Sequence, residues 1–291
     1  MGEQIAIVTG ASSGIGYSLT DELASVGYVV YACARRLEPI KDLVEKHGQH
    51  KVKPYQLDIS NYSEIVRFRT YLEESIPEAK ITLLYNNAGQ ACSFAVTDVT
   101  DKIMQECFQV NVFGHINMTR ELSKMIINGK GTIVFTGSIA GIVSFPFITT
   151  YSATKAAIHQ YARGLHLEMK PFGVRVINAI TGGVETEIGE KRSMPSDSLY
   201  NTAAGRDAFK ARSKEVKKMS ATEYAKQMVS IVEDSETDPV DVYKGSFATI
   251  ARLLAMFIPI WLLDKVLYKS NKLGKINSEY RSTEKQKTKG I

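Results

Sequence analysis

The sequence has 291 residues, which is enough for one large open α/β domain, and its apolar content of 44% and charged content of 23% are those of an ordinary globular protein. Three cysteines with no paired or metal-type spacing exclude a disulfide framework and favour a reducing compartment. We expect no metal ion.

The formal net charge of +5 is concentrated at the C-terminal end of the chain. From Asp264 to Ile291, eight Lys/Arg stand against three Asp/Glu, so the remaining residues sum to zero. The basic character therefore belongs to a tail and not to the body of the protein, and we expect no nucleic-acid partner. At the other end, Met1–Gln4 leads directly into an apolar run, so we expect no secretory signal.

The first 186 residues alternate between predicted strands and helices. Short apolar runs predict strands at Ile5–Thr9, Tyr28–Cys33, Lys53–Leu57, Ile81–Tyr85, Gly131–Thr136 and Val174–Ile180. Helical spacing predicts helices at Gly16–Val26, Glu64–Ser75, Asp101–Asn128 and Tyr151–Met169. This alternation predicts an α/β fold with a doubly wound parallel sheet of Rossmann type, covered on both faces. Ligands bind such sheets at the carboxyl ends of the strands.

The pattern loosens after Thr186, where the chain becomes polar and basic. We expect the α/β domain to span residues 1–245 and to include a lid over the ligand site at about 187–235, with one helix at Ala221–Val232. An apolar segment follows at 246–268. The lysine-rich tail, 269–291, is expected to be mobile.

The apolar segment 246–268 predicts association with a membrane. Its uncharged run, Leu253–Leu263, is shorter than the about twenty residues that a spanning helix needs. Pro259 interrupts the run, and Trp261 is a residue type that prefers the membrane interface. We therefore expect a segment that lies in one leaflet or on a droplet monolayer, assisted by the basic tail. The alternative is an amphipathic helix docked on the enzyme or on a second subunit, which leaves a homo-oligomer open.

A glycine-rich turn, TGASSGIG at Thr9–Gly16, lies between the first predicted strand and the first predicted helix. Glycines let the backbone approach a pyrophosphate, and the N-terminus of the helix attracts its charge. The turn predicts a dinucleotide site that contains Gly10, Ser12, Ser13 and Gly14.

Arg35 and Arg36 follow the second predicted strand, where a carboxylate would meet the ribose hydroxyls of NADH. A pair of cations suits a 2′-phosphate instead, so NADPH is favoured as the cofactor. Two solvated surface arginines are the alternative.

The same turn also matches G-x-S-x-G, a pattern that can mark the nucleophile of a hydrolase, here Ser12. A lipid-ester hydrolase would also need a histidine base. His115, His159 and His166 all lie within predicted helices, which is an awkward place for such a base. Ser12 is better explained as a phosphate-binding hydroxyl.

Tyr151 and Lys155 lie four residues apart in a predicted helix and therefore share one face. A nearby ammonium group favours the phenolate, so we expect a lowered pKa for Tyr151 and proton exchange with a substrate oxygen near neutral pH. Ser138 precedes the tyrosine by thirteen positions, at the end of the fifth predicted strand. Together with the glycine turn, these residues predict a hydride-transfer site.

Five motifs resemble the short-chain dehydrogenase/reductase family over roughly Ile5 to Thr186: the glycine turn, NNAG at Asn86–Gly89, Asn111, Ser138 and the Tyr151/Lys155 pair. The resemblance implies that Ser138 donates a hydrogen bond to a ketone oxygen, that Tyr151 protonates it, and that Asn111 anchors a water chain leading to Lys155. It also implies cofactor contacts by Ile15, Gly16, Asp58, Asn87, Ala88, Gly89, Arg120, Tyr151, Lys155, Val184 and Thr186. One departure is Thr181-Gly182, where the family usually has Pro-Gly.

Three further runs, at 31–39, 158–171 and 238–243, resemble a membrane-associated branch of this family that reduces a lipid-phosphate ketone. The resemblance implies NADPH as cofactor and such a ketone as substrate. It also implies a location on the endoplasmic reticulum and lipid droplets, with the active site facing the cytosol.

A phosphate-bearing substrate needs cations, and the predicted lid offers Lys191, Arg192, Arg206, Lys210 and Arg212. A solvated basic face is the alternative for these residues. For the whole protein, the alternatives are a reductase of steroids or retinoids, the hydrolase using Ser12, and a droplet-coating protein with an idle site.

Overall fold

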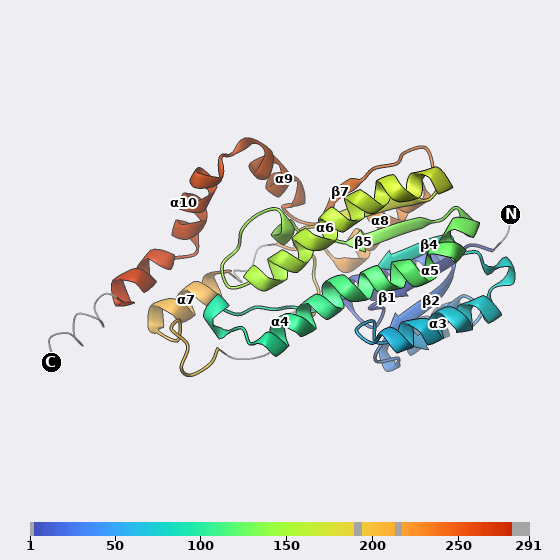
Figure 1. Ribbon diagram of the computed structural model, residues 1–291, viewed down its shortest axis with the longest axis horizontal. Helices are drawn as coiled ribbons and strands as arrows, with labels where there is room; N and C mark the ends of the chain where they lie inside the picture. The colour runs from blue at the N-terminus through green and yellow to red at the C-terminus, as the bar shows by residue number, and fades with distance from the viewer. Residues whose placement is uncertain (1–2, 189–193, 213–216, 281–291) are drawn as a thin grey trace.

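The computed structural model describes residues 3–188, 194–212 and 217–280. In these residues, seven parallel strands form one sheet in the order β3-β2-β1-β4-β5-β6-β7 (Figure 1). The strands are β1 (Ile5–Thr9), β2 (Val29–Ala34), β3 (Val52–Gln56), β4 (Leu83–Asn86), β5 (Thr132–Thr136), β6 (Arg175–Thr181) and β7 (Asp241–Lys244). The predicted doubly wound parallel sheet is confirmed. The edge strand β7 was not predicted, because its run Asp-Val-Tyr-Lys is short and half polar.

The helices alternate with the strands along the chain. They are α1 (Gly14–Ser25), α2 (Lys41–His47), α3 (Tyr62–Ser75), α4 (Asp101–Phe108), α5 (His115–Gly129), α6 (Thr149–Met169), α7 (Ala203–Arg212), α8 (Ala221–Glu233), α9 (Ala248–Phe257) and α10 (Ile260–Ser270). Short 3₁₀ turns are η1 (Glu38–Ile40), η2 (Pro77–Ala79), η3 (Val96–Asp98), η5 (Ile139–Gly141) and η6 (Lys170–Phe172).

Each face of the sheet packs against its own layer of helices. Along β1, Ala6 and Val8 belong to the core shared with α1 and α8, whereas Ile5 and Ile7 belong to the core shared with α3, α5 and α6. The helices of the second layer lie side by side across one face (Figure 1). Because both faces are covered, every residue of β1 is buried, which is why the strand is an unbroken apolar run.

The predicted helix Asp101–Asn128 is interrupted by a π-helical turn, η4 (Gln109–Gly114), between α4 and α5. Such turns widen a helix by one residue and are frequent at functional sites. Asn111 lies in this turn and is fully buried. Hydrophobic periodicity does not reveal the turn, because α4 and α5 continue the same helical path on either side of it.

The predicted lid, 187–235, includes two helices that pack in different places, α7 and α8. Its C-terminal part, α8, packs against α1, and its residues Tyr224 and Met228 are buried in the same core as Leu19 and Leu23. The helix therefore belongs to the layer that supports the glycine turn. The part of the predicted lid that contains α7 lies apart from this layer (Figure 1).

The apolar segment 246–268 is not one helix but two, α9 and α10, separated by an extended stretch at Ile258 and Pro259. Ala248 and Ala251 bury one side of α9, whereas Phe257, Ile260 and Trp261 are 69%, 76% and 61% exposed. Helix α10 projects away from the sheet (Figure 1). Among the described residues, no helix combines the length and the apolar character needed to cross a membrane.

The described part of the predicted mobile tail, 269–280, instead contacts α7. Lys272 Nζ lies 2.8 Å from Asp207 Oδ2, and Glu279 Oε2 accepts a hydrogen bond of 3.1 Å from the backbone N–H of Ala204. Leu273 and Ile276 pack in an apolar cluster with Ala208, Phe147 and Phe209. Residues 281–291 lie outside the described part of the chain.

Candidate active site

A cavity of about 660 Å³ lies at the carboxyl ends of the strands, a volume typical of ligand sites. It lies where the strand order reverses between β1 and β4, the position at which open α/β sheets bind ligands. Its lining comes from the segments that follow β1 to β6 and from the N-terminal part of α6. Of the predicted site residues, it contains Gly10, Ser12, Ser13, Gly14, Ile15, Arg35, Arg36, Asp58, Asn87, Ala88, Gly89, Ser138, Tyr151, Lys155, Val184 and Thr186.

The glycine turn has the shape that a pyrophosphate requires. Gly10 and Gly14 adopt positive φ angles of 70° and 54°. A Cβ on Gly16 would lie 2.2 Å from the carbonyl oxygen of Gly10, so this glycine lets α1 pack tightly beneath the turn. The side chain of Ser13 makes no capping hydrogen bond to α1, which leaves the first N–H groups of the helix to an anion. These residues fit a dinucleotide.

Asn87 connects the first, fourth and fifth strands behind the cavity. Its backbone N–H donates to Thr9 Oγ1 at 2.9 Å, and its side-chain Nδ2 donates to the Thr9 carbonyl at 3.0 Å. Its Oδ1 accepts a hydrogen bond of 3.1 Å from Thr136 Oγ1. The NNAG motif thus has a structural role, holding Ala88 and Gly89 at the cavity wall.

The other end of the cavity contains Arg35 and Arg36, directly after β2, and Asp58, after β3. Both arginines are exposed, so their guanidinium groups are open to a ligand. Asp58 is half-buried, and its Oδ1 accepts hydrogen bonds from the backbone N–H of Ser60 at 2.9 Å and the Ser60 hydroxyl at 2.7 Å. The carboxylate is therefore fixed, while the two cations are free to meet a 2′-phosphate.

Tyr151, Lys155 and His159 lie on one face of α6, and this face approaches the end of β5. Lys155 Nζ donates a hydrogen bond of 2.7 Å to the carbonyl oxygen of Thr136 and lies 5.7 Å from the centre of the Tyr151 ring. Ser138 follows β5, and its Oγ accepts a hydrogen bond of 3.1 Å from the N–H of Ala140. Ser138, Tyr151 and Lys155, three of the four predicted catalytic residues, therefore line the cavity.

The expected lowering of the Tyr151 pKa is wrong. Burial raises the pKa of Tyr151 to about 12, although the hydrogen bond with Ser138 opposes the increase. Packing explains the burial: Tyr151 is half-buried against the apolar cluster of Cys92, Phe94 and Cys107. Burial also lowers the pKa of Lys155 to about 8. Both shifts favour the neutral forms, because a low-dielectric site penalises charge.

Asn111 does not line the cavity. Its Oδ1 accepts a hydrogen bond of 2.8 Å from the N–H of Gln90, and its Nδ2 donates to the Gln90 carbonyl at 2.9 Å and to Thr154 Oγ1 at 3.1 Å. The side chain therefore fixes the loop after β4 to α6, one residue away from Lys155. Its role in a water chain stays a prediction.

The loop after β6 is held by hydrogen bonds where the family usually has Pro-Gly. The N–H of Gly182 donates to the Lys244 carbonyl at 2.8 Å, and the N–H of Gly183 donates to the Ser246 carbonyl at 2.8 Å. Thr181 Oγ1 is hydrogen-bonded to Tyr224 OH at 2.7 Å. Attachment to β7 and α8 thus fixes the path of the chain toward Val184.

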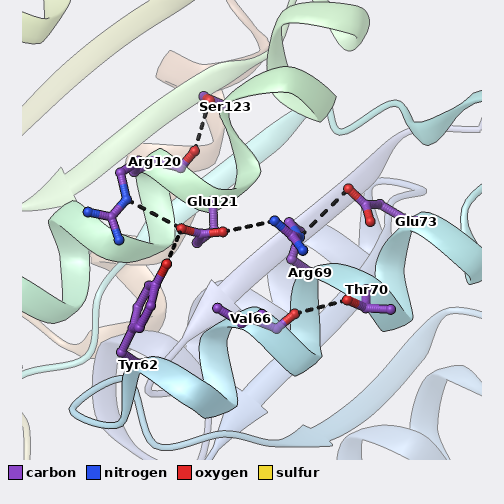
Figure 2. Close-up of polar contacts among 8 residues, drawn as sticks. All are labelled: Tyr62, Val66, Arg69, Thr70, Glu73, Arg120, Glu121 and Ser123. Carbon is purple, nitrogen blue, oxygen red and sulfur yellow. Dashed lines mark hydrogen bonds and ion pairs between the residues drawn. The ribbon is translucent and has the colours of Figure 1, made fainter.

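The structure does not bring Arg120 to the cavity. Its Nε lies 3.3 Å from Glu121 Oε1 on the outer side of α5, and its guanidinium lies 5.1 Å from the centre of the Tyr62 ring (Figure 2). Glu121 also accepts hydrogen bonds from Tyr62 OH at 2.9 Å and Arg69 Nη1 at 3.1 Å. Arg120 belongs to this surface network between α3 and α5.

The cations predicted for a substrate phosphate do not line the cavity within the described chain. Arg206 Nη1 donates to the Oδ1 and carbonyl oxygen of Asn201 at 2.7 and 3.1 Å. Lys210 belongs to α7 and is not among the described residues that line the cavity, whereas the side chain of Arg212, the last residue of α7, lies outside what the structure describes. Lys191 and Arg192 lie outside the described residues.

Sequence reasoning missed Lys218 and His159. Lys218 lines the cavity beside Gly183, and His159 accepts a hydrogen bond of 3.1 Å from the N–H of Ser138. His159 lies four residues after Lys155 and so on the same helical face, a signal that was available from spacing. No local pattern marks Lys218, because its place depends on pairing with the distant β6 loop.

For the hydrolase hypothesis, no histidine is among the described residues that line the cavity with Ser12. His115 Nε2 is hydrogen-bonded to the Ala88 carbonyl at 2.7 Å, and His166 Nδ1 to the Val176 carbonyl at 3.0 Å. His159 is engaged with Ser138. Ser12 lines the nucleotide end of the cavity, in keeping with a phosphate-binding role.

The fold, the glycine turn and the Ser-Tyr-Lys wall define a nucleotide-dependent oxidoreductase, and comparison with known proteins agrees. The family model for short chain dehydrogenases matches residues 4–197. The chain belongs to the short-chain dehydrogenase family.

Individual relatives cover nearly the whole chain. A Saccharomyces cerevisiae protein, NADPH-dependent 1-acyldihydroxyacetone phosphate reductase, is 59% identical over 98% of this chain and 97% of its own. The protein of the same name from Schizosaccharomyces pombe is 32% identical over 68% of each chain. Among solved structures, a short chain dehydrogenase from Burkholderia cenocepacia in complex with NADP is 28% identical, with a TM-score of 0.72 over 91% of this chain and 97% of that one.

Proposed function

We propose that this protein reduces the ketone of 1-acyldihydroxyacetone phosphate with NADPH, giving 1-acylglycerol 3-phosphate, a lysophosphatidate used in glycerolipid synthesis. The single observation that carries this assignment is the 59% identity to the Saccharomyces cerevisiae reductase over 98% of the chain. Because that similarity extends through α9 and α10, it includes more than the nucleotide-binding core common to the family.

The residues of the cavity supply what NADPH binding needs. The N-terminus of α1 and the glycine turn would hold the pyrophosphate, and Arg35 and Arg36 would hold the 2′-phosphate. Lys155 would hold the nicotinamide ribose. When bound, NADPH supplies the hydride that reduces the ketone carbon.

The chain's own residues then handle the ketone oxygen. Ser138 donates a hydrogen bond to that oxygen and polarises the carbonyl. Tyr151, whose pKa of about 12 keeps the phenol protonated at neutral pH, gives its proton to the oxygen as negative charge develops there. A protonated phenol is the form that a reduction requires. Lys155, charged at neutral pH because its pKa is about 8, stabilises the phenolate that remains.

We further propose that α9 and α10 bind the surface of the endoplasmic reticulum or of lipid droplets, with the active site on the cytosolic side. The exposed apolar side chains of both helices support this proposal, together with Lys265 and Lys269 on α10, which suit anionic lipid. A substrate with a long acyl chain is concentrated in such a surface.

The decisive experiment is NADPH oxidation by the purified protein with 1-acyldihydroxyacetone phosphate, a steroid ketone and retinal in the same detergent. We expect turnover of the acyl ketone phosphate to exceed that of the other two by at least about a hundredfold in kcat/KM, since a charged contact to the phosphate and a matched pocket both contribute. Equal or better turnover of the steroid or retinal would replace the proposal by the alternative carbonyl reductase.

A further inference from the structure

The chemistry of the substrate restricts where its phosphate can bind. In 1-acyldihydroxyacetone phosphate, one methylene carbon and one oxygen separate the ketone carbon from phosphorus. When the ketone oxygen lies at Ser138 and Tyr151, the phosphate must therefore enter the same cavity. Phosphate taken from water into a protein site needs charged or hydrogen-bonding partners there.

Within the described chain, four cationic side chains line the cavity: Arg35, Arg36, Lys155 and Lys218. Arg35 and Arg36 follow β2, on the far side of the glycine turn from β5, and belong to the nucleotide end. Lys155 is buried, and its ammonium group donates to the Thr136 carbonyl. Lys218 is the remaining cation. It belongs neither to the nucleotide end nor to the Ser138, Tyr151 and Lys155 group.

The fold holds the backbone of Lys218 against the loop after β6. The N–H of Met219 donates to the Gly183 carbonyl at 3.1 Å, and the N–H of Glu185 donates to the Met219 carbonyl at 2.9 Å. These two bonds place Lys218 beside the stretch of chain that leaves β6 at the active site.

The side chain of Lys218 lies along the bare backbone of Gly183. A Cβ added to that glycine would lie 3.6 Å from Lys218 Cγ, an ordinary packing distance. The side chain is exposed, and within the described residues it makes no ion pair with Asp58 or Glu187, the carboxylates that line the cavity. Its ammonium group is thus available to an anion in this cavity, which Ser138 and Tyr151 also line.

We propose that Lys218 binds the phosphate of the substrate and so determines the preference for phosphorylated ketones. This proposal rests on the proposed function. It assigns recognition of the substrate's negative charge to one residue, Lys218. Lysine suits this task because a compact ammonium on a long flexible stem binds phosphate as a point charge.

The test compares Lys218→Ala, Lys218→Arg and the wild-type protein on two substrates, 1-palmitoyldihydroxyacetone phosphate and the same ketone without phosphate, in one detergent. Lys217→Ala is the matched control, because Lys217 is an exposed neighbouring lysine that does not line the cavity. We expect Lys218→Ala to lower kcat/KM for the phosphorylated ketone about tenfold or more, the value of a charged hydrogen bond, and to leave the other ketone within about twofold. Lys218→Arg should retain most of the preference.

The outcomes separate this proposal from the proposed function. If the wild-type protein prefers the phosphorylated ketone but Lys218→Ala keeps that preference, the assignment of Lys218 is wrong and the proposed function stands. If the wild-type protein shows no preference, both are wrong. A tenfold weaker binding of NADPH to Lys218→Ala, measured by fluorescence titration without substrate, would assign Lys218 to the cofactor and overturn the proposal.

Discussion

The backbone N–H of Ser138 donates a hydrogen bond of 3.1 Å to Nε2 of His159, a residue two turns beyond Tyr151 on α6. Burial lowers the pKa of His159 to about 4, so the ring is neutral and its Nε2 is a hydrogen-bond acceptor. The helix that presents Tyr151 and Lys155 thereby also fixes the backbone that carries Ser138. His159 is a positioning residue, since it acts through Ser138 rather than on the substrate.

This arrangement predicts a loss of stability in acid. The pKa of His159 is about 4 in the folded protein and has the ordinary histidine value of about 6.5 in the unfolded chain. Between these two pH values the unfolded chain binds a proton at His159 and the folded protein does not. The stability that the neutral ring contributes is therefore complete above this window and falls as pH drops through it, by up to about 1.4 kcal/mol per pH unit. His159→Gln should flatten this slope in urea unfolding between pH 7 and pH 4.5. An exposed histidine supplies the control, His50→Gln, and a slope equal to wild type in His159→Gln would contradict the assignment.

Tyr151→Phe should lower kcat for ketone reduction by about a hundred- to ten-thousand-fold, because the variant has no proton to give to the ketone oxygen. NADPH binding, followed by fluorescence, should remain within about threefold of wild type because the glycine turn and arginines are intact. Tyr161→Phe, on the same helix but outside the cavity lining, is the control and should keep full turnover. Substantial turnover by Tyr151→Phe would remove the tyrosine from the mechanism.

The rate of reduction should fall as pH rises through about 8. Burial lowers the pKa of Lys155 to about 8, so the unliganded enzyme loses the ammonium charge that stabilises the phenolate as pH rises above this value. The pH profile of kcat/KM reports groups of the free enzyme and is the appropriate measurement. Tyr151, with a pKa of about 12, should add no further decline below pH 10. A profile that stays level from pH 7 to pH 10 would exclude this role for Lys155.

Arg35→Asp should raise the KM for NADPH about tenfold or more while leaving the KM for NADH unchanged or lower. The substitution removes a cation from the 2′-phosphate site and places a carboxylate where ribose hydroxyls would bind. Steady-state kinetics with both cofactors measures the effect. Lys41→Ala, an exposed cation paired with Glu38 and outside the cavity, is the control. Equal changes in the KM for NADPH and the KM for NADH would show that Arg35 does not bind the 2′-phosphate.

Ile260→Glu should weaken binding to liposomes that contain anionic lipid, because it places a charge in the exposed apolar surface of α10. Co-flotation with such liposomes measures binding, and NADPH oxidation in detergent should be unchanged. Leu167→Glu is the matched control, since Leu167 is equally prominent, at 71% exposed, but lies on α6. Equal effects of the two substitutions, or no effect of Ile260→Glu, would argue against a lipid-binding α10.

The sequence was sufficient to predict the core of this fold because β1, β2 and β5 are buried on both faces and therefore read as continuous apolar runs. It was insufficient for β7, whose edge position permits polar residues, and for α2, whose seven residues bury only Leu43. The packing of α8 against α1 was not visible in the sequence, because an amphipathic helix has the same pattern whether it covers a site or a core.

The candidate site was predictable to the extent that its residues lie at strand ends or share a helix face. Ser138 meets the first condition, because it follows β5, and the Tyr151/Lys155 pair meets the second, because both lie on one face of α6. Two features depend on distant packing: the position of Lys218 beside Gly183, and the burial that raises rather than lowers the pKa of Tyr151. A charge one helical turn away is visible in a sequence, whereas the enclosing side chains of Cys92, Phe94 and Cys107 are not.

The C-terminal region also supports α7, through contacts made by residues 271–280. A chain shortened before α9 would lose the exposed apolar surface of α9 and α10. Helix α7 would also lose three contacts: the ion pair of Asp207, the carboxylate that accepts a hydrogen bond from the Ala204 N–H, and the apolar packing around Ala208. Truncation before α9 would therefore loosen a helix packed against Phe147, four positions before Tyr151. The proposed lipid binding is better tested by single polar replacements on the outward side of α10, which leave these contacts intact.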